Sequence, residues 1–318
     1  MDNGAPVPMS ETPAPNSPLQ ANATDARLMR SATYASVTVA TLLIIVKVMA
    51  WLMTGSVAIL ATLVDSILDA AASVVNMFAV RHALEPADKD HRFGHGKAEP
   101  LAGLAQAALI GGSAVFLLFQ AVERLINPEA VAASDVGIIV MVISIGLTLV
   151  LVLFQKFVVR KTKSVAISAD SLHYQGDLLV NAGVIAALLL GDHLGWVWAD
   201  GAFALAIAGY ILWNALEIVR ESLDLLMDKE FPPEDRARIH EIAIEHPLVS
   251  DIHDLRTRST GPHKFIQFHL ELEGDMMLSK AHAIADKIMY RVEAAFPGSE
   301  VLIHQDPEGV KERRATFK

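Results

Sequence analysis

The chain has 318 residues, of which 53% are hydrophobic and only 19% are charged, and its formal net charge is −10. This composition is too apolar for an ordinary soluble domain and indicates a membrane protein. The acidic balance excludes nucleic acid as a partner, and no strand followed by a glycine-rich turn indicates a nucleotide. Because the chain has no cysteine, any metal site must use histidine and carboxylate ligands.

Six apolar windows follow a proline-rich start. Residues 1–26 combine proline with small polar residues, which predicts a disordered tail and not a signal peptide. A helix needs about 20 apolar residues to cross a hydrocarbon core of about 30 Å. The sequence therefore predicts a transmembrane domain over residues 27–227, with spans in the windows 31–55, 56–80, 100–122, 136–155, 171–191 and 195–216.

Basic residues lie on one side of this predicted topology. Lysine and arginine cluster before the first span, in the connection after the second and in the connection after the fourth, whereas the alternate connections carry only Arg124. Because basic loops stay in the cytoplasm, both termini are predicted to be cytoplasmic.

The composition changes after Met227, where charges become regular and apolar runs shorten. Hydrophobic periodicity predicts an α+β domain over residues 228–307 with the order α-β-β-α-β, of ferredoxin-like or metallochaperone-like type. Its predicted elements are a helix at 233–246, strands at 249–260 and 263–273, a helix at 279–296 and a strand at 300–304. The domain is acidic and rich in histidine, which favours cations as ligands. Residues 308–318 are predicted to be a loose tail.

Two pairs of ligand-type residues fall within the spans. Asp65 and Asp69 are four residues apart in the second span, and His173 and Asp177 repeat that spacing at the start of the fifth. A spacing of four puts both side chains on one helix face, and an aspartate at the membrane centre costs about 2.5–3.5 kcal/mol unless it has a partner. Three carboxylates and one imidazole suit a tetrahedral divalent ion such as Zn²⁺.

An alternative interpretation needs no metal. The two aspartates of the second span can pair with Lys47 or lie near an aqueous mouth, and the pair in the fifth span can lie just outside the membrane. Lys47, the one charge inside the first span, is interpreted as a snorkelling or packing residue.

Two further clusters contain metal-ligand residue types. Asp88, His91 and His95 lie within the loop DKDHRFGHGK and either hold a second ion or form an ordinary solvated loop. In the C-terminal domain, His253, His269 and His304 fall in the three predicted strands, and they can converge if the strands form one sheet. The candidates there are His253, His269, His304, His282 on the second helix and Asp306 after the last strand. The remaining histidines are interpreted as surface residues: His82, His193, His240, His246 and His263.

Several segments resemble the cation diffusion facilitator family. The strongest are GSVAILATLVDSILD at 55–69 and ADSLHYQGD at 169–177. The resemblance extends over about residues 27–307. Within the family, the chain is similar to the bacterial ferrous-iron and zinc efflux pump branch, through the segments FGHGKAE, DLRTRSTGP, HKFIQFHLE and VLIHQDP.

This resemblance implies a homodimer of six-span protomers in the bacterial inner membrane that exports divalent metal in exchange for protons. Zn²⁺ is the expected substrate, with Cd²⁺, Fe²⁺ and Mn²⁺ as further ones, and Zn²⁺ is also expected as a structural or regulatory ion. The implied transport site is Asp65, Asp69, His173 and Asp177, and the implied loop site is Asp88, His91 and His95. The implied cytoplasmic binuclear site is His253, His269, His282, His304 and Asp306, and a charge lock maps to Lys97 and Asp228.

Similar zinc-selective members carry histidine where this chain has Asp65, so the harder ligand set predicts weaker discrimination among divalent ions. An enzyme is not expected, because no span presents a nucleophile with a base. A metal sensor that does not transport and a divalent-cation channel stay open as alternatives; a channel would pass metal without a pH gradient.

Overall fold

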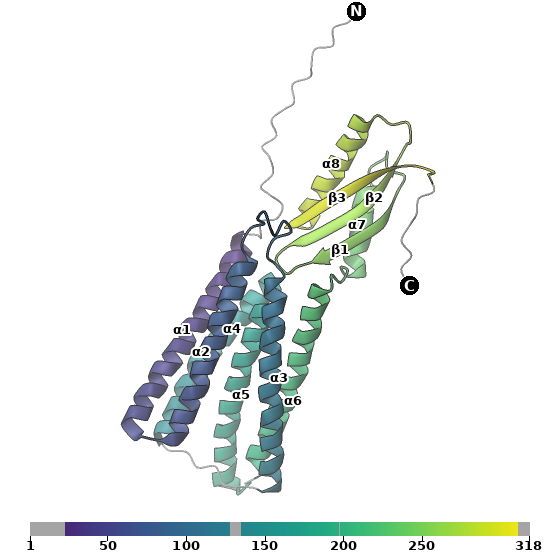
Figure 1. Ribbon diagram of the computed structural model, residues 1–318. Coiled ribbons are helices and arrows are strands. Elements are labelled where there is room, and N and C mark those ends of the chain that lie inside the picture. The colour runs from purple at the N-terminus through teal and green to yellow at the C-terminus, as the bar shows by residue number, and fades with distance from the viewer. Residues whose placement is uncertain (1–22, 128–134, 197, 311–318) are drawn as a thin grey trace, which may run out of the picture.

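The computed structural model describes residues 23–127, 135–196 and 198–310. Residues 1–22 of the predicted N-terminal tail and residues 311–318 of the predicted C-terminal tail lie outside this range. Residues 23–26, which the sequence assigned to the N-terminal tail, form the first turn of the first helix. The described chain forms a helical bundle with an α+β domain at one end (Figure 1).

The bundle confirms the six predicted spans. Each of its six helices is long and apolar enough to cross a membrane. The helices are α1 (Ala23–Thr54), α2 (Val57–Ala83), α3 (Ala98–Ile126), α4 (Asp135–Thr162), α5 (Val165–Leu194) and α6 (Ala199–Leu226). Because their number is even, α1 begins at the same end of the bundle at which α6 leads into the C-terminal domain (Figure 1).

The fifth span begins earlier than the hydrophobic window suggested. Ser164 caps α5 by accepting the N–H of Ile167 at 3.3 Å, so the helix starts six residues before the predicted window at 171. Side-chain caps of this kind satisfy the free N–H groups of the first turn. His173 and Asp177 therefore lie well inside the helix and not at its end.

Helix α5 contacts α2, α3, α4 and α6. Its buried residues Ala169 and Leu172 pack with Ile110 of α3 and Ile211 of α6. A helix surrounded in this way can present one face to α2 and another to its other neighbours. The face toward α2 carries the predicted ligands.

The C-terminal domain has the predicted order α-β-β-α-β. Its elements are α7 (Pro233–Ile244), β1 (Asp251–Ser259), β2 (Lys264–Leu272), α8 (Leu278–Ala295) and β3 (Ser299–Pro307). The sheet order is β1-β2-β3, with β1 antiparallel and β3 parallel to β2. The parallel pair is possible because α8 supplies the crossover that parallel strands require.

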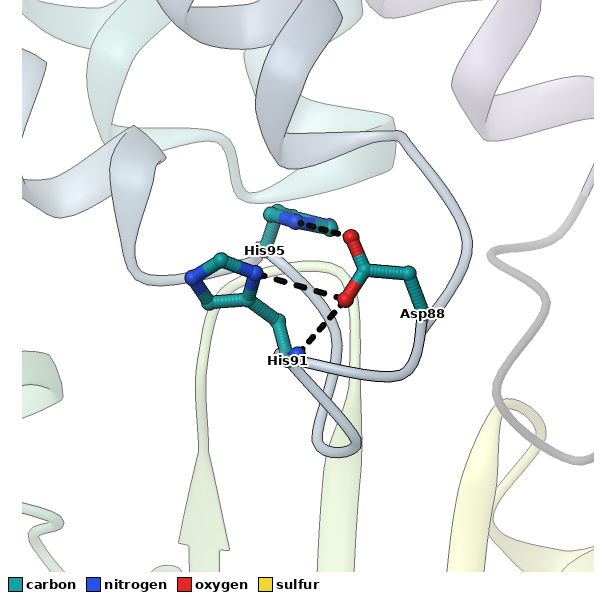
Figure 2. Close-up of side chains that lie close together, drawn as sticks. All are labelled: Asp88, His91 and His95. Carbon is teal, nitrogen blue, oxygen red and sulfur yellow. Dashed lines mark hydrogen bonds and ion pairs between the residues drawn. The ribbon is translucent and has the colours of Figure 1, made fainter.

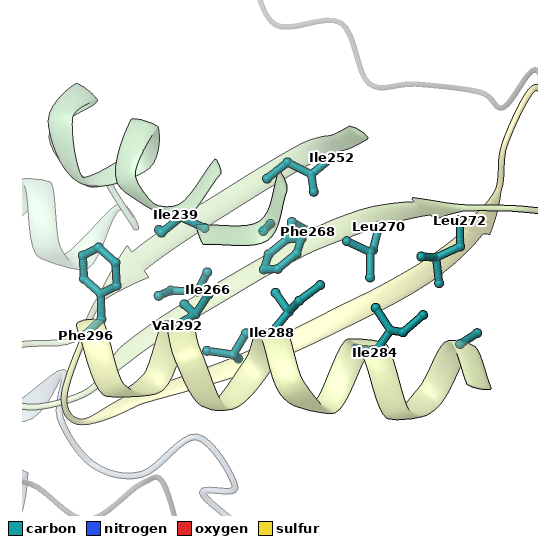
Figure 3. Close-up of a cluster of buried hydrophobic side chains, with 14 of the residues drawn as sticks. Ile239, Ile252, Ile266, Phe268, Leu270, Leu272, Ile284, Ile288, Val292 and Phe296 are labelled. Carbon is teal, nitrogen blue, oxygen red and sulfur yellow. The ribbon is translucent and has the colours of Figure 1, made fainter. Parts of the chain in front are cut away.

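One face of this sheet forms the domain core. Ile284 and Ile288 of α8 are one helical turn apart and pack against Phe268 and Leu270 of β2, while Ile239 contributes from α7 (Figure 3). Since neighbouring strand residues point to opposite faces, the residues between these buried positions of β2 lie on the face that the helices do not cover. His269 is one of them.

We predict that Ile288→Ala destabilises the C-terminal domain by about 2–5 kcal/mol, because a fully buried side chain is lost and a cavity remains. Hydrogen exchange of the β1–β3 amides in the full chain measures the change. The neighbouring exposed residue provides the control, since Lys287→Ala should change stability by less than about 0.5 kcal/mol. Equal protection in the two variants would contradict the assigned core.

Candidate metal centres

The first cluster joins α2 and α5 inside the bundle. His173 Nε2 lies 3.0 Å from Asp69 Oδ1 and 3.9 Å from Asp177 Oδ2. These three side chains each offer a ligand atom within 4.8 Å of the others, and all are partly buried. Two carboxylates and an imidazole at this spacing can surround a divalent ion with little rearrangement.

Asp65, the fourth predicted ligand of this site, is not part of that group. It lies one turn before Asp69 in α2 with an exposed side chain. The i, i+4 spacing places Asp65 and Asp69 on the same side of α2, as predicted. Of the two, only Asp69 belongs to the group formed with His173 and Asp177 of α5. Its participation in metal binding stays a prediction.

A buried carboxylate that the sequence analysis missed lies one turn before His173. Asp170 accepts hydrogen bonds from Gln106 Nε2 at 3.0 Å and Gln155 Nε2 at 2.7 Å. Ser73 of α2 also donates to Asp170, at 3.5 Å. These neutral donors satisfy a charge that would otherwise be costly inside the bundle. They tie α5 to α2, α3 and α4 beside the metal-ligand face; Asp170 stands in the segment ADSLHYQGD, but its spacing alone gave no signal.

The second cluster lies in the α2–α3 loop, residues 84–97. Asp88 Oδ1 accepts the N–H of His91 at 2.6 Å, and its carboxylate also lies 3.4 Å from His91 Nδ1 and 3.3 Å from His95 Nε2 (Figure 2). The N–H of His91, supported by that of Asp90, holds the pKa of Asp88 below its usual value. The three predicted loop ligands thus face one another around an ionised carboxylate.

His82 extends this loop cluster. Its ring centroid lies 4.5 Å from that of His95, and its Nδ1 lies 2.8 Å from Glu85 Oε2. A carboxylate on one ring nitrogen is the arrangement that orients the other nitrogen of a metal-binding histidine. The residue is exposed, as expected, but sequence spacing did not associate it with the loop site.

The third cluster lies on the open face of the C-terminal sheet. The strand register pairs His253 with His269 and His269 with His304, so one histidine from each strand stands in a row. Asp306 connects the row: its carboxylate is 2.6 Å from His269 Nδ1, 3.4 Å from His253 Nε2 and 3.1 Å from His304 Nε2. The side chain of Asp306 is almost fully buried.

An irregularity in the backbone of β1 lies beside this third cluster. The register of β1 shifts between His253 and Arg256, and Asp254 adopts a positive φ of 49° in that bulge. Bulges redirect side chains and often lie beside functional sites. Glu271 Oε1 contacts His253 Nδ1 at 3.0 Å. Sequence reasoning missed this carboxylate, although its i+2 spacing from His269 places it on the same face.

His282, the fifth predicted ligand of the cytoplasmic site, lies apart from the row. It is exposed on α8, and its Nε2 is 3.5 Å from Asp286 Oδ2. Among the described residues of the C-terminal domain, the ligand atoms that lie within 4.8 Å of one another belong to His253, His269 and Asp306. The role of His282 stays a prediction.

The α2–α3 loop and the end of α6 are joined to the C-terminal domain by charged contacts. Lys97 Nζ lies 3.0 Å from Asp228 Oδ1 and donates to the carbonyl oxygen of Leu226 at 3.2 Å. Arg258 of β1 lies 3.4 Å from the second carboxylate oxygen of Asp228. The pair for which the family resemblance implied a charge lock is therefore in contact, and Arg258 adds a third member.

Aromatic packing and close backbone approach reinforce this junction. The Arg258 guanidinium stacks over the rings of Phe93 and Phe265, 5.0 and 4.7 Å from their centroids. Gly96 approaches the C-terminal domain so closely that a Cβ there would lie 2.8 Å from the carbonyl oxygen of Thr260. Glycine is required at this contact because no larger residue fits.

The interpretation of His263 as a surface residue is wrong. Only 2% of it is exposed, because the α2–α3 loop covers it at Gly94. Neither ring nitrogen has a hydrogen-bond partner among the described residues, and burial lowers the pKa of His263 below its usual 6.5. A contact between domains buried this residue, and such contacts leave no local sequence pattern.

Fold and clusters together define a class: a multi-span membrane protein with ligand sets for divalent metal in its bundle, in a loop and on its C-terminal sheet. Residues 33–227 match the family model of the cation efflux transmembrane domain, and residues 231–308 match that of the cation efflux protein cytoplasmic domain. The chain belongs to the cation efflux family, and it is a divalent metal cation efflux transporter.

Curated relatives are similar over nearly the whole chain. The "Cation-efflux pump FieF" of Shewanella oneidensis is 51% identical over 89% of this chain and 95% of its own length. The protein of the same name from Escherichia coli O139:H28 is 47% identical over 90% of this chain and 95% of its own length. A solved structure described as "Metal-bound C-terminal domain of CzcD transporter from Thermotoga maritima" is 29% identical, covers 25% of this chain and 93% of its own, and has a TM-score of 0.24.

We predict that the junction around His263 weakens as the pH falls below 6.5. The unfolded imidazole takes up a proton near that pH, whereas the buried ring does so only at lower pH, so the stabilisation present above 6.5 is lost toward the lower folded pKa. Hydrogen exchange of residues 259–264, between about pH 8 and about pH 5, measures the effect in the full chain.

His263→Gln should remove this pH dependence, and His246→Gln serves as a matched control because His246 lies in the same domain and is partly exposed. A pH dependence that survives His263→Gln unchanged would contradict the assignment.

Proposed function

We propose that this protein exports divalent metal ions from the bacterial cytoplasm across the inner membrane in exchange for protons, with both termini and the C-terminal domain in the cytoplasm. The single observation that carries the proposal is the meeting of Asp69 with His173 and Asp177 inside the bundle. Membership of the cation efflux family and the relatives named as cation-efflux pumps support it.

Proton exchange follows from the chemistry of the ligands. A metal ion binds the deprotonated imidazole and carboxylates, so loading releases protons and unloading takes them up. Histidine changes its charge between pH 5 and 8, which makes His173 the residue best suited to couple the two events. Alternating exposure of the site to the two sides then converts a proton gradient into metal export.

The proposed substrates are Zn²⁺ together with Cd²⁺, Fe²⁺ and Mn²⁺. Asp65, Asp69 and Asp177 supply three carboxylates against the single imidazole of His173. Oxygen ligands discriminate less sharply than nitrogen and sulfur ligands among these ions. Competition between Zn²⁺ and each other ion in a transport assay measures the selectivity.

The C-terminal domain is proposed to regulate transport as a metal-dependent dimer contact. His253, His269 and Asp306 form a ligand set on an open sheet face, beside His304 of β3, and a second copy can approach this face. The matched cytoplasmic-domain family supports a homodimer. Metal bound between two copies would favour one arrangement of the domains, and the contact of Lys97 with Asp228 would transmit it to the bundle.

We predict that Asp69→Asn and Asp177→Asn abolish zinc flux into proteoliposomes driven by a pH gradient, because each removes a negative ligand from the bundle site. Asp135→Asn is the matched control, since Asp135 is an exposed aspartate at the start of α4 and its substitution should leave flux unchanged. Flux that survives both site variants would refute the assigned site, and flux indifferent to the gradient would favour a channel.

We also predict that Asp306→Asn weakens zinc binding by the full chain at the C-terminal site by at least about tenfold, because its carboxylate contacts three histidines. Isothermal titration in detergent measures the affinity. Asp275→Asn, at an exposed position of the same domain, should bind like the unaltered chain. Unchanged affinity in Asp306→Asn would remove this residue from the site.

A further inference from the structure

Lys47 does not extend away from the bundle as a snorkelling lysine would. Its Nζ donates a hydrogen bond to Ser66 Oγ at 2.6 Å and another to the carbonyl oxygen of Thr62 at 3.0 Å. Both acceptors belong to α2, so the side chain crosses from α1 to the helix that carries two of the predicted ligands. Since both acceptors are neutral, they hold the ammonium group without cancelling its charge.

The position of this ammonium relates it to the transport site. Thr62 and Ser66 precede Asp69 in α2, toward the α1–α2 turn at the end of the bundle opposite the C-terminal domain (Figure 1). Ser66, which accepts from Lys47 Nζ, follows Asp65 directly and lies about one helical turn before Asp69. The ammonium group is therefore held about one helical turn from Asp69, on the side of the site that faces away from the C-terminal domain; in the proposed function this is the side through which an exported ion leaves.

The positive charge of Lys47 affects the total charge of the transport site. Three carboxylates with a neutral imidazole and one divalent ion leave a single negative charge, and the ammonium of Lys47 neutralises it. A site that lacked Lys47 would hold its ion more tightly, because two positive charges repel each other more strongly inside a protein than in water. It would also be able to attract a further cation. Tight binding slows a transporter when release limits turnover.

We propose that Lys47 sets the affinity of the transport site: its positive charge weakens the binding of a divalent ion and promotes release of that ion toward the far side of the membrane. The inference rests on the proposed export function. The ionisable side chains of the predicted transport site are Asp65, Asp69, Asp177 and His173. The neighbouring serine and threonine provide only neutral acceptors.

The test compares three variants of the full chain: Lys47→Gln and Lys47→Met, which remove the charge, and Lys47→Arg, which keeps it. Zinc affinity is measured by titration in detergent, and KM and kcat are measured in proteoliposomes with a pH gradient. Lys47→Gln and Lys47→Met should lower both Kd and KM by roughly tenfold and lower kcat as well, because binding strengthens while release slows. Lys47→Arg should behave like the unaltered chain.

Two controls separate this effect from others. Lys156→Gln removes an exposed lysine of α4 and should change nothing. Adding Asp69→Asn to Lys47→Gln should abolish the gain in affinity, which separates the bundle site from the loop and C-terminal sites. Size-exclusion profiles show whether each variant keeps its assembly.

A lower kcat with unchanged or higher KM, or a failure of Lys47→Arg to restore the unaltered behaviour, would overturn the proposal and assign Lys47 a packing role. If the unaltered chain shows no gradient-driven flux, the export function fails. The titrations of Lys47→Gln then still decide whether Lys47 weakens metal binding.

Discussion

The cost of placing carboxylates inside a membrane is the constraint on which the rest of the structure depends. Asp69 and Asp177 face each other from α2 and α5 with His173 between them. Groups of this kind persist inside a bundle only where partners or a bound cation compensate their charge. A mobile cation can fill that role, and protons can replace it when it leaves. In the proposed function, this penalty links the loss of one cation from the site to the binding of another.

The surrounding polar groups fix the geometry of that site without occupying it. Asp170 ties α5 to three other helices through neutral donors, and Lys47 ties α1 to α2. Asp170 lies one turn before His173 in α5, and Ser66, the partner of Lys47, lies about one turn before Asp69 in α2. The helices that hold the site are therefore joined by polar contacts. A movement of these helices relative to one another must break several of these contacts at once.

Communication with the C-terminal domain depends on a small junction. Lys97, Asp228 and Arg258 join the α2–α3 loop, the end of α6 and β1. The same loop carries the predicted ligands Asp88 and His95. A metal ion bound in this loop would act on the junction directly, because the ligands and the contact residues share one short segment. The loop and the end of α6 together connect the bundle to the C-terminal sheet.

Sequence alone determined the six spans, the order of the C-terminal elements and the ligand pairs four residues apart, because hydrophobic periodicity and helix geometry are local. It predicted that a histidine from each strand can converge, and the strand register brought His253 and His269 together. Only the tertiary structure decided that His263 is buried, that Lys47 reaches α2 and that Asp65 lies outside the closest ligand group. These three features depend on which surfaces of different helices or domains are in contact. The spacing of residues along one segment does not determine those contacts.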